Sequence, residues 1–267
     1  MNADATTIAA KGSPGTGAPG TSAPAIPFDA GPFPRGLLGF IVLATDLIVE
    51  ENLFRMAPAG VGVSFSRIRT DNDTTVANLA KHLDHMAEAA AILQPDAKPA
   101  TICYACTSGS IVMGPDRIRA EIARGAPSSQ ATTLVSGVLA ALRAVGAKRI
   151  AVGTPYIDEI NRLEADFLRR EGFEIAAMEG LQIVDGEAMG RIPPGYIRDF
   201  ALGLDRPDAD AIFVSCSAIR TIDVLQEIED RVGKPVIASN QAMMWHCLRL
   251  AGVKDAIPGF GRLFDRR

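Results

Sequence analysis

The sequence predicts an α/β protein built from two similar lobes, and three observations lead to this fold class. Short apolar runs alternate with amphipathic stretches from Gly36 onward, which is typical of parallel sheets flanked by helices. The segments 141–148 (ALRAVGAK) and 247–254 (CLRLAGVK) share the pattern L-R-x-x-G-x-K. Two predicted strands end in a cysteine, Cys106 and Cys216. We therefore expect a duplicated unit, with two pseudosymmetric lobes and an active site in the cleft between them.

Seven short runs are predicted to be strands, because they are too continuously apolar to have one exposed face. They span residues 36–45, 60–68, 99–106, 148–155, 173–180, 210–216 and 234–240. Four longer stretches carry apolar residues at helical spacing, and the last three end at a glycine that suits a helix C-cap. These predicted helices span residues 74–93, 133–146, 158–172 and 240–252. Ligands bind beyond the carboxyl ends of parallel strands, so functional residues are expected there.

Composition narrows the class of protein further. The 267 residues, 48% of them apolar, can form one large domain or two lobes. We place the lobes at 35–147 and 148–267 and leave open whether the C-terminal helix of the first lobe crosses to the second. The net charge of −4 comes from well-mixed acidic and basic residues, which predicts neither a nucleic-acid nor a membrane partner. No apolar run approaches the roughly 20 residues that span a bilayer.

The first 34 residues consist mainly of Ala, Gly, Pro, Ser and Thr, and we expect them to form a disordered tail. They lack the basic start and the continuous apolar stretch of a secretory signal, so a cytoplasmic location is expected. Four cysteines scattered over the chain are too few for a disulfide framework, and reduced thiols are the better interpretation.

The four cysteines differ in their local patterns. Cys103 and Cys106 lie three positions apart on a strand and point to opposite faces, so they cannot act as a pair, and Cys103 is expected in the core. Cys106 precedes the small polar residues TSGS at a helix start, where the helix dipole favours a thiolate, and Cys216 lies in a similar context. We therefore expect at least one of these two thiols to be more acidic than a free cysteine. Cys247 lies within an apolar helix and is expected to be buried and inert.

Other candidate sites are weaker. No G-x-G-x-x-G or P-loop lysine motif follows a predicted strand, which argues against a nucleotide cofactor. His82 and His85 share a helix face without a third ligand at metal spacing, so a solvated helix face is expected rather than a metal site. His246 adjoins Trp245 and Cys247, and we expect a partly buried imidazole with a satisfied hydrogen bond.

Five motifs together carry a resemblance to a known family. They are YACTSGS, TPYIDEIN, VSCSAIRT, SNQAMMWHCLRLAG and the C-terminal PGFGRLFD. The chain resembles the aspartate/glutamate racemase superfamily over residues 36–267, in the branch of maleate cis-trans isomerases and arylmalonate decarboxylases. Within that branch, CTSG, SNQA and WH are similar to the ectoine-utilisation proteins. The resemblance implies two pseudosymmetric α/β lobes, an active site between them and no cofactor.

The resemblance also implies a role for the two strand-end cysteines. In racemase members one thiolate removes an α-proton while the opposite thiol supplies one, which makes Cys106 and Cys216 the catalytic acid–base pair. In maleate isomerase members the first cysteine adds to the alkene, which allows rotation before elimination. Arylmalonate decarboxylases have Gly where this chain has Cys106, and this departure makes a pure decarboxylase a weaker match.

Several polar residues are suited to hold a substrate carboxylate. Proton removal beside a carboxylate creates an enediolate, whose two negative oxygens need preorganised hydrogen-bond donors. Thr107, Ser108, Ser217 and Tyr156 are donors by type and match positions that resembling proteins use for this purpose. Asn161, one helical turn beyond Tyr156, is expected to support the same pocket. The alternative for Tyr156 is a side chain packed at a domain seam.

One position bears on the substrate. Maleate isomerases resemble this chain around IVLATD but have an Asn about where Asp46 stands. Because a carboxylate is a poor ligand for another carboxylate, we hypothesise that Asp46 faces a cationic group of an amino-acid-like substrate. A helix N-cap at Asp46 is the equally supported alternative. Arg67 and Arg69 are candidates for a distal carboxylate site or for surface ion pairs.

These observations favour a cofactor-independent racemase or cis-trans isomerase that acts on a small carboxylic acid, either amino-acid-like or maleate-like. The alternative reaction is decarboxylation of a malonate through the same enediolate, with Cys216 as proton donor. An alternative of another class is a small-molecule binding module without turnover, since two facing α/β lobes also build receptors. The expected partner is a small carboxylate substrate, and we expect a homo-oligomer.

Overall fold

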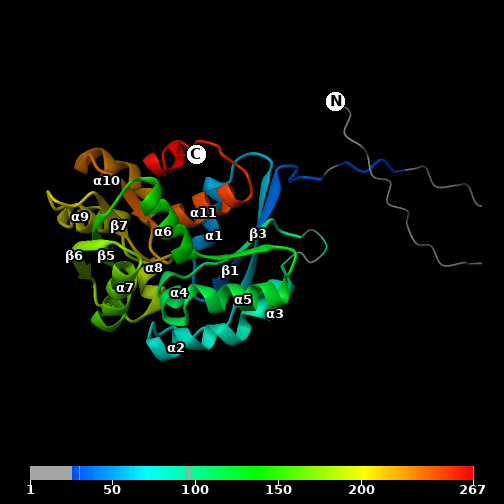
Figure 1. Cartoon of the computed structure of the whole chain (residues 1–267), viewed down its shortest axis with the longest axis horizontal. Helices are drawn as coiled ribbons and strands as arrows, with labels where there is room; N and C mark the ends of the chain where they lie inside the picture. The colour runs from blue at the N-terminus through cyan, green and yellow to red at the C-terminus, as the bar shows by residue number, and fades with distance from the viewer. Residues whose placement is uncertain (1–25, 30, 94–95, 97, 267) are drawn as a thin grey trace, which may run out of the picture.

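The computed structural model describes residues 26–29, 31–93, 96 and 98–266, which form two four-stranded parallel sheets flanked by helices (Figure 1). The first sheet has the order β2-β1-β3-β4, with β1 (Gly36–Leu43), β2 (Val61–Ile68), β3 (Thr101–Tyr104) and β4 (Gln130–Thr133). The second has the order β6-β5-β7-β8, with β5 (Arg149–Thr154), β6 (Glu174–Gly180), β7 (Ala211–Val214) and β8 (Val236–Ala238). The two sheets have the same strand order when each strand of the first is matched to the strand of the second numbered four higher, so that β1 corresponds to β5. The predicted fold class is confirmed.

All seven predicted strands are present, and β4 is the strand that the sequence pattern did not reveal. Its residues, QATT, include no large apolar side chain, so they lack the pattern of a buried strand. The strand forms because β3 offers its free edge, and the pairing runs from Thr101 opposite Gln130 to Tyr104 opposite Thr133.

The helices of the first half are α1 (Val49–Met56), α2 (Val76–Ala80), η1 (Lys81–His85), α3 (Met86–Ala91), α4 (Thr107–Met113), α5 (Pro115–Gly125) and α6 (Leu134–Ala144). Those of the second half are α7 (Asp158–Arg170), α8 (Gly186–Gly190), α9 (Pro194–Gly203), η2 (Thr221–Asp223), α10 (Leu225–Val232), α11 (Ser239–Leu250) and η3 (Arg262–Asp265). Three predicted helices correspond to α6, α7 and α11. The predicted helix 74–93 is interrupted by the 3₁₀ turn η1 between α2 and α3.

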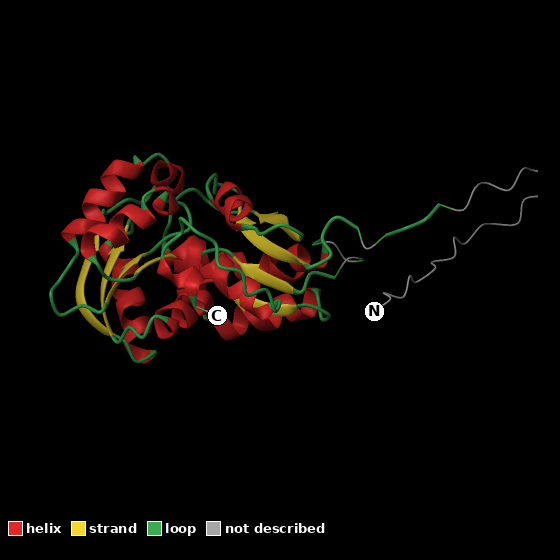
Figure 2. Ribbon diagram, turned by 90° about the horizontal axis from the view of Figure 1, so that it is seen from above, coloured by secondary structure: helices red, strands yellow, loops and turns green. Residues whose placement is uncertain are grey.

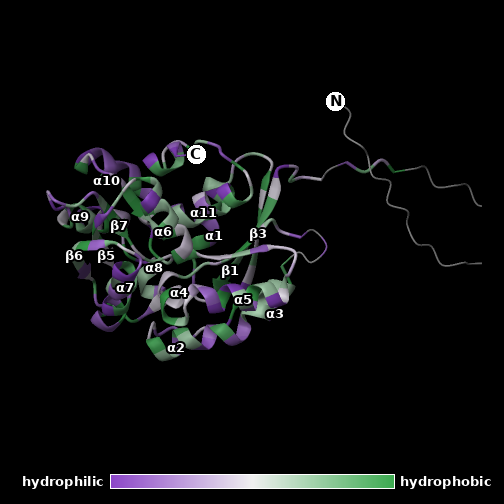
Figure 3. Cartoon of the chain, in the orientation of Figure 1, coloured by the Kyte–Doolittle hydropathy of each residue, from purple (hydrophilic) through white to green (hydrophobic). Residues whose placement is uncertain are grey.

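A shared core lies between the two sheets. Figure 2 shows two separate groups of strands, each covered by helices, and Figure 1 shows α1, α6 and α11 between them. One continuous apolar cluster includes Phe40 of β1, Val152 of β5, Phe213 of β7 and Met243 of α11, all fully buried. The C-terminal helix α11 therefore packs on elements of both halves. In contrast, the outer helix α10 shows hydrophilic turns in Figure 3, as expected for a helix with one solvated face.

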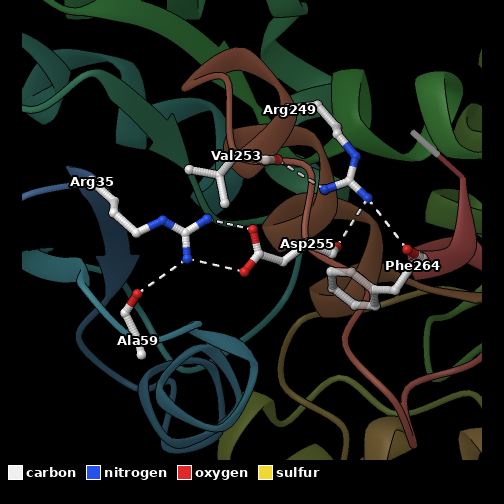
Figure 4. A network of polar contacts seen from close by, with 6 residues as sticks. All are labelled: Arg35, Ala59, Arg249, Val253, Asp255 and Phe264. Carbon is white, nitrogen blue, oxygen red and sulfur yellow. Dashed lines mark hydrogen bonds and ion pairs between the residues drawn. The ribbon is translucent and has the colours of Figure 1, made fainter.

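The C-terminal segment is fixed to the start of β1 by two arginines (Figure 4). Arg249 of α11 donates hydrogen bonds to the carbonyl groups of Val253, Asp255 and Phe264. Arg35, just before β1, forms an ion pair with the Asp255 carboxylate. These contacts hold the turn after α11 against the first sheet.

Most of the predicted disordered tail, residues 1–25 and 30, lies outside the described residues. Residues 26–29 and 31–34 form neither helix nor strand. Within the described part of the chain, no helix is both long enough and apolar enough to cross a bilayer.

Glu164 is a buried carboxyl group on the core-facing side of α7. Its side chain has 0% exposure, and neither carboxylate oxygen has a hydrogen-bond partner. Burial raises its pKa from 4.5 to about 7, because the charged form loses its hydration. Between these two values the folded state therefore holds a proton that the unfolded state has released.

We predict that Glu164 makes the protein less stable as pH rises through this window. The folded state binds more protons than the unfolded state between 4.5 and about 7, so the free energy of unfolding falls with rising pH. Glu164→Gln removes the charge and should be more stable than the wild type above this window, by up to about 3 kcal/mol. Urea unfolding at about pH 5 and about pH 8 measures the difference. The exposed Glu159→Gln variant on the same helix is the control, and equal pH dependence in all three proteins would contradict the prediction.

Candidate active site

A pocket lies where the carboxyl ends of the four central strands meet. Each strand is followed within three residues by a side chain that lines this pocket, namely Asp46 after β1, Cys106 after β3, Tyr156 after β5 and Cys216 after β7. Because β1 and β3 correspond in sheet position to β5 and β7, the two halves contribute equivalent corners. The fold thus brings both strand-end cysteines to one pocket.

Six of the eight residues that the sequence suggested for the site line this pocket. They are Asp46, Cys106, Ser108, Tyr156, Cys216 and Ser217. Thr107 and Asn161 are buried but do not line it. The two thiols are each 5% exposed, so both are nearly enclosed by protein.

The first corner turns from β3 into α4 at Cys106. Cys106 is the N-cap of α4, and its Sγ accepts a hydrogen bond from the Gly109 N–H at 3.3 Å. The Ser108 Oγ lies 3.6 Å from the same sulfur. A Cβ at position 109 would lie 2.2 Å from the Tyr104 Oη, so only glycine leaves room for that hydroxyl beside the corner.

The second corner follows β7 and holds its cysteine in an uncommon backbone conformation. Cys216 has φ of 102°, a region that residues with a Cβ rarely adopt and that often marks functional sites. Its N–H donates to the Ser239 Oγ at 3.0 Å, and its Sγ accepts from the Ala218 N–H at 3.3 Å. The sulfur also lies 3.9 Å from the Met189 Sδ. These contacts fix the direction of the thiol.

Thr107 does not line the pocket as the expected donor, whereas Asn161 supports the corner that carries Tyr156, as its position after Tyr156 led us to expect. The Thr107 hydroxyl lies 3.0 Å from the Ser239 Oγ and so joins the two cysteine corners. Asn161 accepts from the Thr154 hydroxyl and donates to the Tyr156 carbonyl at 3.1 Å. Both side chains are fully used in holding corners together, which leaves no group free to face a substrate.

Asp46 has two carboxylate oxygens with different surroundings. Oδ1 accepts from the N–H groups of Ile48 and Val49 at 2.8 and 3.0 Å and so holds the turn that leads into α1. The N-cap of α1 is Ile48, so the prediction of Asp46 as the N-cap residue is wrong by two positions. Oδ2 is buried without a hydrogen-bond partner, and the residue lines the pocket while only 4% exposed. Burial raises the pKa of this carboxyl group, against the effects of the Val49 and Ile48 N–H groups, the Ser217 hydroxyl and the Arg67 charge. One oxygen therefore serves the fold while the other is unpaired.

Arg67 and Arg69 do not line this pocket. Arg67 donates to the carbonyl groups of Leu43, Ala44 and Asp46 and pairs with Glu50 at 3.0 Å. It braces the β1–α1 loop, so the surface-pair interpretation holds and the distal carboxylate site does not. Arg69 borders a neighbouring cavity instead.

Burial changes the acidity of both pocket thiols in the direction opposite to the sequence expectation. It raises the pKa of Cys106, and the Gly109 N–H, the Ser108 hydroxyl and the Tyr104 hydroxyl oppose this effect without cancelling it. It also raises the pKa of Cys216, where the Tyr156 hydroxyl is the largest opposing group. The expectation of an acidic thiol is therefore wrong for this pocket, because the loss of hydration outweighs the donors at each corner.

The remaining cysteines and histidines have structural surroundings. Cys103 and Cys247 are fully buried, as predicted. His246 lies 3.1 Å from the Thr132 Oγ1, which confirms a satisfied imidazole. The predicted solvated face at His82 is wrong, because His82 is 1% exposed and bonds to Tyr104 and Thr70. No group of three metal-ligating side chains occurs among the described residues.

The loop 70–74 forms one wall of the pocket and was not among the residues predicted for the site. Asn72 accepts from the Gly186 N–H and donates to Asp185, and the Thr74 N–H donates to the Val184 carbonyl. The loop after β2 is thereby joined to the loop before α8, across the two halves. Its polar sequence has the pattern of an ordinary surface loop, so no local signal distinguishes it.

The fold and the pocket define this protein as an α/β protein with two facing lobes, each of which contributes a strand-end cysteine to one shared pocket. The family model described as arylmalonate decarboxylase matches residues 64–264, and the chain belongs to this family. The arylmalonate decarboxylase of Bordetella bronchiseptica is 39% identical over 145 residues, which cover 53% of this chain and 60% of that protein. The maleate isomerase of Nocardia farcinica is 26% identical over 236 residues, covering 85% of this chain and 94% of that protein.

Solved structures of the same two kinds share the fold. A Cys-to-Ser mutant of Nocardia farcinica maleate cis-trans isomerase, with a covalently bound succinylcysteine intermediate, superimposes with a TM-score of 0.79 at 26% identity and covers 86% of this chain and 98% of its own. A Gly-to-Cys, Cys-to-Ser double mutant of arylmalonate decarboxylase in the liganded form gives 0.79 at 30% identity and covers 86% and 99%. The predicted branch of the superfamily is confirmed.

We predict that neither pocket thiol is more reactive at neutral pH than a free cysteine. Because burial raises the pKa of both, alkylation by iodoacetamide should reach half of its maximal rate above the ~8.5 of a free thiol. Mass spectrometry of single-cysteine peptides over a pH series measures each rate separately. The Cys106→Ser and Cys216→Ser variants identify the two signals, and rapid alkylation of either thiol near pH ~7 would contradict the prediction.

Proposed function

We propose that this protein is a cofactor-independent racemase or cis-trans isomerase of a small carboxylic acid, with Cys106 and Cys216 as the catalytic pair. One observation carries the proposal, namely that equivalent corners of the two halves bring both thiols to a single pocket. A carbon held between the sulfurs can lose a proton to one of them and receive a proton from the other. Racemisation follows when the two transfers occur on opposite faces.

The hydroxyl groups of the pocket suit the charge that develops in this reaction. Loss of an α-proton places negative charge on the substrate carboxyl oxygens, and donors fixed by the fold stabilise it without rearrangement. Ser108, Ser217 and Tyr156 line the pocket and supply such donors. Asn161 and Thr154 hold the corner that carries Tyr156, so we infer that they act on the substrate only through its position.

Cis-trans isomerisation uses the same pocket through a covalent step. The Cys106 thiolate would add to one alkene carbon while the other carbon takes a proton from Cys216, which gives a single bond that can rotate. Return of that proton and departure of the sulfur restore the alkene in the trans form. The succinylcysteine intermediate named for the Nocardia isomerase structure supports this route by analogy.

Decarboxylation is a second candidate, because the matching family model and the 39% identical relative are both named for that activity. In this reaction a malonate loses carbon dioxide, and Cys216 protonates the resulting enediolate. Cys106 would then be incidental. Release of carbon dioxide from an arylmalonate, retained in a Cys106→Ser variant, would favour this candidate over the isomerase.

The charges around the pocket suggest a substrate with a cationic group. Asp46, Asp71 and Asp73 line the pocket, and no lysine, arginine or histidine is among the described residues that do. Asp71 already pairs with Lys81, whereas the buried Asp46 Oδ2 has no partner. A small zwitterion, with its carboxylate at the hydroxyl donors and its cation at Asp46, would satisfy both sets of groups.

We predict that Cys106→Ser and Cys216→Ser each lower kcat by about 10²–10⁴, because a hydroxyl is a much weaker acid and nucleophile than a thiol. Solvent deuterium should enter the substrate α-carbon with the wild type, in a screen of maleate, aspartate, diaminobutyrate derivatives and arylmalonates. Cys247→Ala, in the core and away from the pocket, is the control. Tight binding without turnover of any of these acids would instead indicate a binding module.

We predict that Asp46→Asn lowers the preference for cationic substrates. Asn retains an oxygen for the Ile48 and Val49 N–H groups, so the turn before α1 should stay in place while the charge is lost. The ratio of kcat/KM for an amino acid to that for a dicarboxylate without nitrogen should fall by about tenfold or more. Asp185→Asn is the control, because the Asp185 carboxylate also accepts a backbone N–H, as the N-cap of α8, but does not line the pocket. An unchanged ratio in Asp46→Asn would refute the cation assignment.

A further inference from the structure

His82 is a buried histidine that the proposed reaction does not use. Its side chain is 1% exposed, although the sequence pattern of residues 74–93 predicts a solvated helix face at this position. The 3₁₀ turn η1 interrupts that predicted helix at Lys81–His85, and His82 is the residue of this turn that becomes buried. A 3₁₀ segment between two helical pieces often marks a functional hinge or local strain. The position of His82 therefore calls for an explanation from its contacts.

Both ring nitrogens of His82 have a hydrogen-bond partner. Nδ1 lies 2.7 Å from the Tyr104 Oη, and Nε2 lies 2.8 Å from the Thr70 Oγ1. The Thr70 hydroxyl donates to the Asp71 carbonyl at 3.1 Å, so its oxygen accepts from the Nε2–H of His82. Nδ1 then has a lone pair that accepts from the Tyr104 O–H. Burial lowers the pKa of His82 to about 4, so the ring is neutral and both bonds persist at neutral pH.

On one side, this link supports the corner that carries Cys106. The Tyr104 side chain has 0% exposure, and among the described residues His82 is the only hydrogen-bond partner of its hydroxyl. A Cβ at Gly109 would lie 2.2 Å from that hydroxyl, so the oxygen occupies the space beside the Gly109 backbone. Gly109 in turn donates its N–H to the Cys106 Sγ at 3.3 Å. His82 therefore fixes the oxygen against which the start of α4 packs.

On the other side, the link reaches the wall of the pocket. Thr70 is the first residue of the loop 70–74 and lines the pocket itself. The far end of this loop is held by the second half of the chain, because the Thr74 N–H donates to the Val184 carbonyl at 2.8 Å. One imidazole is thus bonded both to the pocket wall and to the tyrosine that supports the Cys106 corner.

We propose that His82 is a positioning residue, which fixes the Cys106 corner to the pocket wall at loop 70–74. His82 does not line the pocket, so it acts on a substrate only through Tyr104 and Thr70. Without the imidazole, the buried hydroxyl of Tyr104 would have no partner and the oxygen beside the start of α4 would no longer be held in place. The catalytic meaning of this role rests on the proposed function.

The Cys216 corner has a different support and provides an internal reference. The Ser239 Oγ accepts from the Cys216 N–H at 3.0 Å, and the Ala218 N–H donates to the Cys216 Sγ at 3.3 Å. Neither contact involves His82. A general loss of stability would loosen both cysteine corners, whereas loss of the His82 link should loosen only the corner of Cys106.

Amide hydrogen exchange followed by NMR tests the link without a substrate. In His82→Leu both ring nitrogens are lost, so the Gly109 and Thr74 N–H groups should exchange about tenfold faster than in the wild type, through easier local opening. The Ala218 N–H should change by less than about twofold. His82→Gln keeps one donor and one acceptor, and it should return the Gly109 rate to within about threefold of the wild type.

Two further variants make the exchange result decisive. Tyr104→Phe removes one buried oxygen and should accelerate Gly109 exchange by a similar factor, which tests the link even where His82→Leu does not fold. His246→Leu removes another partly buried imidazole, away from the pocket, and should leave Gly109 exchange unchanged. Unchanged Gly109 exchange in a folded His82→Leu or Tyr104→Phe protein would overturn the proposal. Equal acceleration at Gly109 and Ala218 would also overturn it.

Kinetics separate the failure of this proposal from the failure of the proposed function. With a substrate in hand, His82→Leu and Tyr104→Phe should each lower kcat about tenfold, because a displaced thiol is poorly aligned with the reacting carbon, and the double variant should fall no further. KM should change by less than about threefold in Tyr104→Phe, since Tyr104 does not line the pocket. Faster Gly109 exchange with an unchanged kcat would support the link and refute Cys106 as a catalytic residue. A lower kcat without faster exchange, or additive losses in the double variant, would overturn the link.

Discussion

The start of α11 is the constraint on which the pocket depends, because it ties the two cysteine corners together. The Ser239 hydroxyl accepts from the Cys216 N–H and bonds to the Thr107 hydroxyl beside Cys106. Its neighbour Asn240 donates to the Ser217 carbonyl and to Asn52 of α1. These buried hydrogen bonds join corners from both halves of the chain at one point. These bonds fix the two corners relative to each other, so that both thiols face the same pocket.

The same enclosure that brings the thiols together sets their chemistry. Nearly complete burial favours neutral sulfur, and the donors at each corner, mainly backbone N–H groups and tyrosine hydroxyls, act against it. The resting pocket can therefore admit a carboxylate without facing a thiolate charge, while a thiolate that forms during turnover finds donors in place. The proposed cationic end of a substrate would lie at the acidic residues of the same enclosed space, Asp46 and Asp73.

The two halves are equivalent in topology but not in the surroundings of their thiols. Cys106 caps a helix in ordinary backbone geometry, and its sulfur lies beside the Gly109 N–H and the Ser108 hydroxyl. Cys216 has a positive φ and contacts Met189 and the pocket-facing Tyr156. A duplicated fold thus supplies two positions for a thiol, and the neighbours of each position differentiate them.

The sequence by itself determined the fold class, seven of the strands and six of the residues that line the pocket, because apolar runs and strand-end residues are local features. Tertiary structure decided the rest. Thr107 and Asn161 have the chemistry of substrate donors, and only their distant or cross-corner partners show that they hold the frame instead. Strand β4, the loop 70–74 and the buried His82 each depend on a neighbour from another element. The acidity of the thiols was also beyond the sequence, since burial is a property of the assembled lobes and not of the residues around a cysteine.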